Sequence, residues 1–409
     1  MIFFIIFAKK IDMETIRQKF YEKYQNTSLD SIRNHINLID WQNRLIGIKG
    51  SRGVGKTTLL LQYIKSNYQP DDKVMYVSLD DFYFLENRLY NFASDFYKRG
   101  GELLIMDEVH RYPNWSVEIK NLYDDFAKLK MIFTGSSMLQ LKKARADLSR
   151  RAVMYELPGL SFREYVQFET QRKFSVYTFE EILQNHITIA MDISSKIKPL
   201  TYFDKYLQFG YYPFYMENLS AFHSKLSEVI TTVIEIDIPQ FENIMSSNLI
   251  YIKKLLKIIS GSVPFKPNMN SLSERTGISL NTMKLYLQHL KDANLILMLN
   301  TPEKSLNELS KPEKIFLHNT NIMYNLAAEN INSGNIRETF LYNQLNMHHK
   351  VYASEFADFL IDQKYNLEVG GKNKTRKQII NHADSFIVKD NIEIGSSNII
   401  PLWLFGFLY

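Results

Sequence analysis

The chain lacks cysteine altogether, over 409 residues. That absence excludes a disulfide framework, thiolate zinc sites and a thiol nucleophile, and it fits a reducing cytoplasm. Long apolar runs are missing too, because no stretch reaches the roughly 18 consecutive apolar residues that a membrane-spanning helix needs. We therefore expect a cytoplasmic protein that makes no membrane contact.

A large excess of charge of either sign is also absent, because the net charge is only +5. Such a balance permits contact with nucleic acid without arguing for it. Hydrophobic residues make up 45% of the chain, enough to build real cores, and the length predicts about two to four domains. Residues 1–10 are apolar and end in lysines, without the basic beginning of a signal peptide. We expect translation to start at Met13, where an amphipathic segment opens, so residues 1–12 would be a misassigned start.

The most informative segment, residues 45–58, fits the P-loop pattern at every fixed position. Gly50 is followed, after four residues, by Gly55, Lys56 and Thr57. In this pattern glycines let backbone N–H groups surround a polyphosphate, the lysine reaches the β- and γ-phosphates, and the threonine hydroxyl ligates Mg²⁺. An apolar strand before the loop and a helix after it supply the required context. The predicted ATP-binding residues are Gly50, Ser51, Arg52, Gly53, Val54, Gly55, Lys56, Thr57 and Thr58.

A second motif follows further along, where the apolar strand Leu103–Asp107 ends in two adjacent acids. This is the Walker B arrangement of a P-loop ATPase. The first acid, Asp107, holds Mg²⁺ together with Thr57, and the second, Glu108, can orient and deprotonate the attacking water. Thr57 and Asp107 are therefore the predicted metal ligands, and Lys56 and Glu108 are predicted catalytic residues.

Two more features lie downstream of the Walker B strand. The strand at 131–137 ends in small hydroxyl residues at the same edge of the sheet, and Ser136 is the residue predicted to sense the γ-phosphate or the attacking water. A basic segment at 142–151 precedes the next strand. An arginine there can stabilise charge on the transferring phosphoryl group, from its own or a neighbouring subunit. A solvated helix face is an equally weighted alternative for this segment.

The motifs resemble, in their order, those of prokaryotic AAA-type (AAA+ superfamily) ATPases with an uncharacterised conserved C-terminal region. The segments that carry the resemblance are LDD at 79–81, MDEVHRYPNW at 106–115, FTGSS at 133–137, ADLSRRAVMYELPGLSFREY at 146–165, YLQFGYYPF at 206–214, KPEKIFLHNTNIMY at 311–324, IRETFLYNQL at 336–345 and LEVGGKNK at 367–374. The resemblance covers nearly the whole chain. It implies a sensor strand between the P-loop and Walker B strands. It also implies a catalytic arginine finger at Arg151, although this chain has Arg150 where the family has glycine.

Alternating strands and helices predict an α/β fold, a P-loop parallel sheet with helices on both faces. The expected strands are 45–48, 74–79, 103–107, 131–135 and 153–157. The expected parts of the chain are an N-terminal helical segment at 1–40, a P-loop ATPase core at 41–160, a helical lid at 161–250, a winged helix at 251–310 and a small restriction-endonuclease-like α/β domain at 311–409. Asp237, near the end of the lid region, is expected to be a surface or capping carboxylate.

Residues 271–290 carry the clearest helix–turn–helix pattern, with a tight turn and an N-cap at 276–279. Residues 292–300 are expected to form the wing strand. In a DNA-binding protein the second helix enters the major groove, where it would present Asn281, Thr282, Lys284 and Gln288. Its exposed face carries only two lysines, however, and winged helices also serve as docking spacers in ATPases. DNA and a protein both stay open as partners.

The segment from Lys311 onward is expected to be mixed α/β, with a terminal strand at 399–409. A helical Glu338, Asp358 at the start of a strand and Glu368 on the next strand follow the order of the PD-(D/E)xK nuclease core, in which carboxylates hold Mg²⁺ and a lysine polarises the scissile phosphate. Gly370 occupies the lysine position, so we expect a retained fold with lost or weakened catalysis, unless Lys372 substitutes from a shifted position. A basic patch that could hold phosphates comprises Lys372, Lys374, Arg376 and Lys377.

The leading hypothesis is an ATP-binding and ATP-hydrolysing switch of the AAA+ type that uses Mg²⁺ and acts on or near DNA. One alternative is an ATP-gated nuclease of the PD-(D/E)xK type. The other is a small-molecule P-loop kinase, which the paired Walker B acids and the long C-terminal half disfavour. The sequence leaves the partner and the oligomeric state open.

Overall fold

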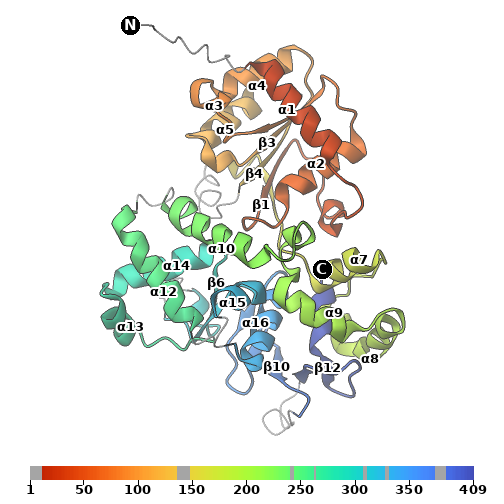
Figure 1. The fold of residues 1–409 in the computed structure, drawn as a ribbon, viewed down its shortest axis with the longest axis vertical. Coiled ribbons are helices and arrows are strands. Elements are labelled where there is room, and N and C mark those ends of the chain that lie inside the picture. The colour runs from red at the N-terminus through yellow and green to blue at the C-terminus, as the bar shows by residue number, and fades with distance from the viewer. Residues whose placement is uncertain are drawn as a thin grey trace. The chain divides into compact units, whose positions relative to one another are not determined.

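The computed structural model describes residues 12–135, 148–239, 244–261, 264–306, 311–327, 331–373 and 384–409. The chain divides into two compact units. The first comprises the residues up to Gly50 together with Gly55–Leu157, and the second comprises Ser51–Val54 together with Pro158–Tyr409. Figure 1 labels many of the elements of both units.

The first unit is built on a parallel sheet of five strands in the order β2-β3-β4-β1-β5. The strands are β1 (Leu45–Lys49), β2 (Val74–Ser78), β3 (Leu103–Asp107), β4 (Lys130–Gly135) and β5 (Val153–Glu156). All five strands were predicted from the sequence, and β4 lies between β1 and β3 as the family resemblance implied. Every residue of β3 is buried, and all but the last, Asp107, are apolar, as expected for a strand that is covered on both faces.

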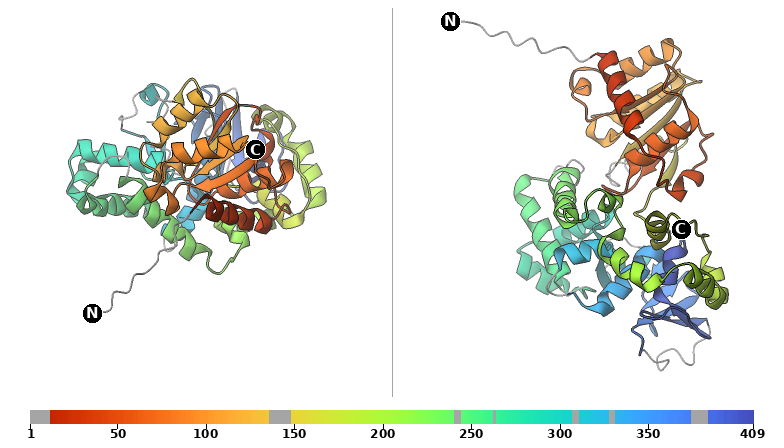
Figure 2. Two further views of the ribbon diagram at one scale, coloured as in Figure 1. Left: turned by 90° about the horizontal axis from the view of Figure 1, so that it is seen from above. Right: turned by 45° about the vertical axis from the view of Figure 1, so that its right-hand side comes forward.

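Helices cover this sheet. They are α1 (Met13–Asn26), α2 (Lys56–Asn67), α3 (Tyr83–Glu86), α4 (Leu89–Lys98) and α5 (Trp115–Asp125). Helix α1, red in Figures 1 and 2, packs against both β2 and α2, and α4 packs against α5. The carboxyl ends of the parallel strands lie at one edge of the sheet, which is where ligands bind in folds of this kind.

The second unit begins with the helical region that the sequence predicted. Its helices are α7 (Phe162–Thr170), α8 (Phe179–Lys196), α9 (Pro199–Lys205) and α10 (Phe222–Thr232). Two of them start with capping boxes, in which Ser161 pairs with Glu164 and Thr178 pairs with Glu181.

The segment predicted as a helix–turn–helix, residues 271–290, forms two helices joined by a tight turn in the same unit. These helices are α13 (Met269–Thr276) and α14 (Leu280–Asp292). Helix α12 (Leu249–Ser260) precedes them, and an antiparallel pair of strands, β6 (Ile296–Leu299) and β7 (Lys314–Leu317), follows. Gly277 closes α13 with a φ of 75°, and the Ser279 side chain caps α14. The strand expected within 292–300 is β6.

A second five-stranded sheet of mixed direction ends the chain, in the order β12-β11-β10-β9-β8. Its strands are β8 (Val351–Tyr352), β9 (Phe359–Ile361), β10 (Tyr365–Gly370), β11 (Ser385–Lys389) and β12 (Ile399–Pro401). The helices α15 (Thr320–Leu326) and α16 (Ser333–Leu345) precede it along the chain. The expected terminal strand at 399–409 is wrong for most of its length. After β12 the chain turns into a 3-10 helix, Leu402–Phe407, whose six residues are all buried and pack against α7, α8 and α16.

Of the helices that the structure describes, none combines the length and the apolar character that crossing a membrane requires.

Candidate functional site

The P-loop joins β1 to α2, and two of its glycines have a backbone conformation that other residues rarely adopt. Gly53 has a φ of 84° and Gly55 has a φ of 91°. A Cβ atom at either position would strain the backbone. The loop then leads directly into the N-terminus of α2 at Lys56, and a helix N-terminus favours bound phosphate. The backbone therefore has the form that the sequence motif predicts.

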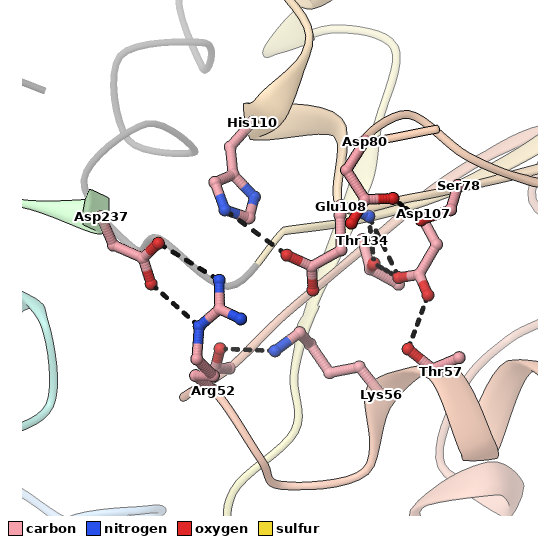
Figure 3. A network of polar contacts seen from close by, with 11 residues as sticks. Arg52, Lys56, Thr57, Ser78, Asp80, Asp107, Glu108, His110, Thr134 and Asp237 are labelled. Atoms are coloured by element: carbon pink, nitrogen blue, oxygen red, sulfur yellow. Dashed lines mark hydrogen bonds and ion pairs between the residues drawn. The ribbon is translucent and has the colours of Figure 1, made fainter. Parts of the chain in front are cut away.

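Lys56, the predicted phosphate-binding cation, is buried at the base of this loop. Its Nζ donates a hydrogen bond to the carbonyl oxygen of Gly50 at 3.0 Å, and only 5% of the residue is exposed (Figure 3). The ammonium group is therefore held against the loop by the loop's own backbone.

Asp107, the first Walker B acid, is surrounded by hydroxyl groups. Its Oδ2 accepts hydrogen bonds from Thr57 Oγ1 at 2.6 Å and from the Tyr76 hydroxyl at 2.7 Å. Its Oδ1 accepts from Thr134 Oγ1 and from the backbone N–H of Glu108, the latter at 3.1 Å (Figure 3). Only 1% of Asp107 is exposed, so these donors replace the water that an ionised carboxylate would otherwise bind.

The arrangement of Thr57 and Asp107 fits Mg²⁺. The hydroxyl of the first and the carboxylate of the second touch, and oxygen atoms are the ligands that this ion prefers. Mg²⁺ is usually bound by one or two protein groups together with phosphates and water, so a cage of several carboxylates is not needed. Indeed, no group of three or more acidic or histidine side chains gathers closely enough to hold a metal among the described residues.

Glu108, the second Walker B acid, has a φ of 52°. This left-handed conformation is uncommon for a residue with a side chain, and such residues cluster at functional sites. One carboxylate oxygen, Oε2, lies 3.5 Å from Nε2 of the buried His110 (Figure 3). The backbone turn after β3 and the neighbouring imidazole together direct this carboxylate.

Thr134 was not among the residues predicted from the sequence. It lies in β4, where its hydroxyl contacts Asp107 and accepts a hydrogen bond from the N–H of Glu108 at 3.2 Å. Ser136, the predicted sensor, falls outside the described residues. The available signal was the run of small hydroxyl residues at the end of this strand, which contains both Thr134 and Ser136.

Arg151, the predicted arginine finger, forms a two-pronged ion pair. Its Nε and Nη2 lie 2.8 Å from the two carboxylate oxygens of Asp124, near the end of α5. Each partner stabilises the charged form of the other, so the hydrogen bonds raise the pKa of Arg151 and lower the pKa of Asp124. Most of the basic segment before Arg151 lies outside the described residues.

The tip of the P-loop, Ser51–Val54, packs as part of the second unit. Within that unit the Arg52 guanidinium lies 3.3 Å from Asp237 (Figure 3), and Asn294 donates to the Ser51 hydroxyl at 3.0 Å. Asp237 is only 4% exposed. The expectation of a surface carboxylate was therefore wrong, because sequence spacing could not reveal a buried ion pair with a residue so far away.

A separate carboxylate cluster lies in the C-terminal part of the second unit. Lys314 Nζ, from β7, lies 3.1 Å from Glu338 Oε2 and 3.6 Å from Asp358 Oδ1. Asp358 also accepts a hydrogen bond from the Val369 N–H at 2.9 Å. Burial, followed by the nearby charge of Asp358, raises the pKa of Glu338, while Lys314 opposes that rise. The charge of the buried Glu368 raises the pKa of Glu338 further, so both of the other predicted carboxylates act on Glu338.

The cation of this cluster is Lys314, which was not predicted from the sequence. Gly370 lies at the end of β10, and the candidate substitute Lys372 is exposed, with its carbonyl oxygen accepting from Lys389 Nζ at 3.1 Å. The other members of the basic patch, Lys374, Arg376 and Lys377, lie outside the described residues.

The second helix of the helix–turn–helix differs from the prediction at Gln288. This side chain was expected to face DNA, but Gln288 is only 9% exposed and donates to Asp292 at 2.9 Å. Asn281 is exposed, and Thr282 and Lys284 are partly exposed. Leu285 is 42% exposed on the same helix.

Comparison with known proteins bears on both halves of the chain. Residues 42–166, which hold the P-loop, both Walker B acids and Thr134, match the family model of the AAA domain. This segment is an AAA domain. Residues 200–333 match a domain of unknown function (DUF8612). A relative along most of the chain is an uncharacterized protein of Methanocaldococcus jannaschii, MJ1637. It is 25% identical over 405 residues, which covers 90% of this chain and 85% of that protein.

Solved structures similar to this chain include AMPPCP-bound DnaA from Aquifex aeolicus and PCH-2 from C. elegans. DnaA is 16% identical, and the match covers 67% of this chain and 86% of DnaA with a TM-score of 0.25. PCH-2 is 15% identical, and the match covers 68% of this chain and 66% of PCH-2, again with a TM-score of 0.25. No functional conclusion follows from likenesses at these scores.

Proposed function

We propose that the protein is an ATP-hydrolysing switch. The observation that carries this proposal is the contact of Thr57 with Asp107 at 2.6 Å, directly after a P-loop whose glycines have the required backbone. It brings together the hydroxyl and the carboxylate that Mg²⁺·ATP needs, in a segment that matches the AAA domain. Mg²⁺, when bound, neutralises part of the charge on the phosphates.

Each side chain of the site has a distinct role in this proposal. The P-loop backbone and Lys56 bind the phosphates, and Thr57 and Asp107 hold the metal. Glu108 accepts the proton of the attacking water. Thr134 holds both Walker B residues in place, through the side chain of Asp107 and the backbone of Glu108. A small-molecule kinase would need no second acid placed to deprotonate water.

The switch part of the proposal rests on the tip of the P-loop. Ser51 and Arg52 are predicted to bind ATP, and Ser51 accepts a hydrogen bond from Asn294 while Arg52 pairs with Asp237. A bound triphosphate would draw Arg52 toward itself and weaken its attraction to Asp237.

Two substitutions test the assignment of the ATP site. Lys56→Ala should abolish ATP binding, because it removes the fixed cation that faces the phosphates. Glu108→Gln should still bind ATP, while the hydrolysis rate falls about a hundredfold or more through loss of the general base. Equilibrium binding of a fluorescent ATP analogue and steady-state phosphate release measure the two effects. Hydrolysis by Glu108→Gln at the wild-type rate would contradict the assignment.

Arg151 is proposed as the arginine finger of this site. It would act after leaving Asp124 or from a neighbouring subunit, since a finger can be supplied in either way. Mixing Lys56→Ala with Arg151→Ala distinguishes the two possibilities. Recovery of ATP hydrolysis in the mixture would indicate that the arginine acts between subunits.

The partner of the switch is proposed to be DNA or a protein, in the cytoplasm. Binding to DNA through the basic side chains should be mainly electrostatic, so affinity should fall steeply as salt rises. Replacing the basic patch around Lys372 should reduce that salt dependence. Measuring ATP hydrolysis with and without duplex and single-stranded DNA tests the first partner class. Absence of DNA binding even at low salt would favour a protein partner, which the exposed Leu285 on α14 would suit better.

A further inference from the structure

Tyr76 contacts the metal-binding carboxylate of the ATP site, although it lies outside both nucleotide-binding motifs. The residue belongs to β2, the strand beside the Walker B strand β3. Its hydroxyl donates to Asp107 Oδ2 at 2.7 Å, on the oxygen atom that also accepts from Thr57. All three residues lie in the first unit, so the contact follows from the packing of one sheet with its own P-loop.

The register of the sheet explains how Tyr76 reaches Asp107. In the parallel pair of β2 and β3, Tyr76 lies beside Ile105 and Ser78 lies beside Asp107. Side chains alternate between the two faces of a strand, so Ile105 and Asp107 share a face with Tyr76. A diagonal neighbour two residues along is within reach of a long aromatic side chain. A shorter residue at this position would leave Oδ2 of Asp107 without that donor.

The ring of Tyr76 is fixed by its own packing. Tyr76 is only 3% exposed, its ring is stacked 6.4 Å from the ring of Phe20 in α1, and Lys23 Nζ lies 4.9 Å from the ring centre. The hydroxyl is therefore held at a defined place by contacts that do not involve Asp107. Groups that hydrogen-bond to a metal-binding carboxylate orient it, and their loss typically costs about 10–100-fold in metal affinity or activity.

We propose that Tyr76 is a positioning residue for the divalent cation that accompanies ATP, acting by orienting the Asp107 carboxylate. This inference rests on the proposed ATP-binding function. It assigns Tyr76 no contact with the nucleotide or with the attacking water. The expected consequence is specific: the hydroxyl matters for binding of the metal and is irrelevant to binding of the nucleotide alone.

The test compares Tyr76→Phe with the wild type in two binding measurements. Mn²⁺ is titrated in the presence of saturating ADP and followed by electron paramagnetic resonance, and a fluorescent ADP analogue is titrated in EDTA. Tyr76→Phe should weaken Mn²⁺ binding about tenfold and leave nucleotide affinity in EDTA within about twofold of the wild type. The steady-state rate of ATP hydrolysis should recover at high Mg²⁺.

Tyr63→Phe is the matched control. Tyr63 is a buried tyrosine of α2 in the same unit, and its hydroxyl lies 3.4 Å from the Tyr68 hydroxyl. Its loss should change neither measurement. If Tyr76→Phe does not fold, Tyr76→His keeps an aromatic ring but shortens the reach to Asp107, and the same loss of Mn²⁺ affinity is expected from it.

Three outcomes would overturn the inference. Unchanged Mn²⁺ affinity would mean that Asp107 is oriented without the hydroxyl. Tighter Mn²⁺ binding would mean that the hydroxyl competes with the metal for Oδ2. An equal loss of nucleotide affinity in EDTA would mean that Tyr76 supports the whole site. A wild-type protein that binds no nucleotide in either measurement would instead overturn the proposed function itself, and the inference with it.

Discussion

The two units of this chain stabilise their carboxylates in opposite ways, the buried Asp107 in the first and the half-buried Glu338 and Asp358 in the second. The described contacts of Asp107 come from three hydroxyls and a backbone N–H, all of which are uncharged. Glu338 and Asp358 share the ammonium group of Lys314. Neutral donors stabilise a carboxylate without cancelling its charge, whereas a lysine cancels it. The first arrangement suits an acid that receives a metal, and the second suits an ion pair that is complete without one.

The largest difference between the two regions should appear in ATP hydrolysis. Asp107→Asn removes the negative charge that attracts the metal, and hydrolysis should fall about a hundredfold or more, since such stabilisation is worth several kcal/mol. Glu368→Gln, the corresponding change in the C-terminal cluster, should leave the rate within about twofold. Steady-state phosphate release measures both. An equal loss in the two variants would mean that the clusters act in one reaction.

The second difference concerns folding stability. Lys314→Met should lower the free energy of unfolding by about 2–3 kcal/mol, because it leaves two nearby acids without their cation. This is less than the ~3–5 kcal/mol expected for a fully buried pair, since about a fifth of each partner is exposed: 19% of the Lys314 side chain and 18% of that of Glu338. Urea denaturation measures the change.

Its control is Lys225→Met. Lys225 forms an exposed pair with Glu217 at 2.6 Å, with 41% and 67% of the two side chains exposed, and such pairs contribute ~1 kcal/mol or less. A loss in Lys314→Met no larger than in this control would contradict the comparison.

The effect of Lys314→Met should also depend on pH. Lys314 opposes the rise in the pKa of Glu338 that burial causes, so its removal lets that pKa rise further above the ordinary value of 4.5. An acid whose pKa is raised on folding loses stability as pH increases from its ordinary pKa to its raised one. The deficit of Lys314→Met relative to the wild type should therefore be larger at pH 8 than at pH 5. A deficit independent of pH would indicate lost packing of the lysine stem instead.

A smaller effect is expected from Thr134, whose hydroxyl contacts Oδ1 of Asp107, whereas that of Tyr76 contacts Oδ2. Thr134→Val should slow hydrolysis about tenfold, because a hydrogen bond to a charged group is worth roughly 1.5–3 kcal/mol. ATP affinity should stay within about twofold. Thr339→Val is a control from the second unit, where the buried Thr339 hydroxyl has no hydrogen-bond partner among the described residues. That change should be neutral in hydrolysis and should not lower stability.

From the sequence we could predict those parts of the proposed ATP site that are local along the chain. The P-loop and the Walker B acids are short motifs whose chemistry requires given residue types at given spacing, and the five strands are apolar runs long enough to recognise. The C-terminal elements that carry Glu338 and Glu368 were also found, because each acid lies in a recognisable helix or strand.

The missed residues are those that act across elements. Tyr76 and Thr134 reach Asp107 only because β2, β3 and β4 are neighbours in a particular register. Lys314 reaches its carboxylates from a strand that pairs with β6 and lies outside the nuclease-like motif. Gln288 was wrongly predicted to be exposed, because the helical pattern does not show that its side chain donates a hydrogen bond to Asp292, one helical turn along. Register and side-chain pairing, which decide such contacts, are tertiary properties.

The smallest effect is expected from the C-terminal cluster, which should not cleave DNA. Nuclease chemistry of this kind needs carboxylates that hold a metal and a lysine free to stabilise charge on the scissile phosphate. Here the lysine is Lys314, and it is engaged with Glu338 and Asp358. A metal entering the cluster would have to displace an ammonium group that already balances these acids. Purified protein incubated with plasmid and branched DNA, Mg²⁺ or Mn²⁺, and ATP should therefore leave the DNA intact on a gel. Robust cutting that Glu368→Ala abolishes and Asp107→Asn does not would show an independent nuclease, and cutting that both changes abolish would show a nuclease gated by ATP.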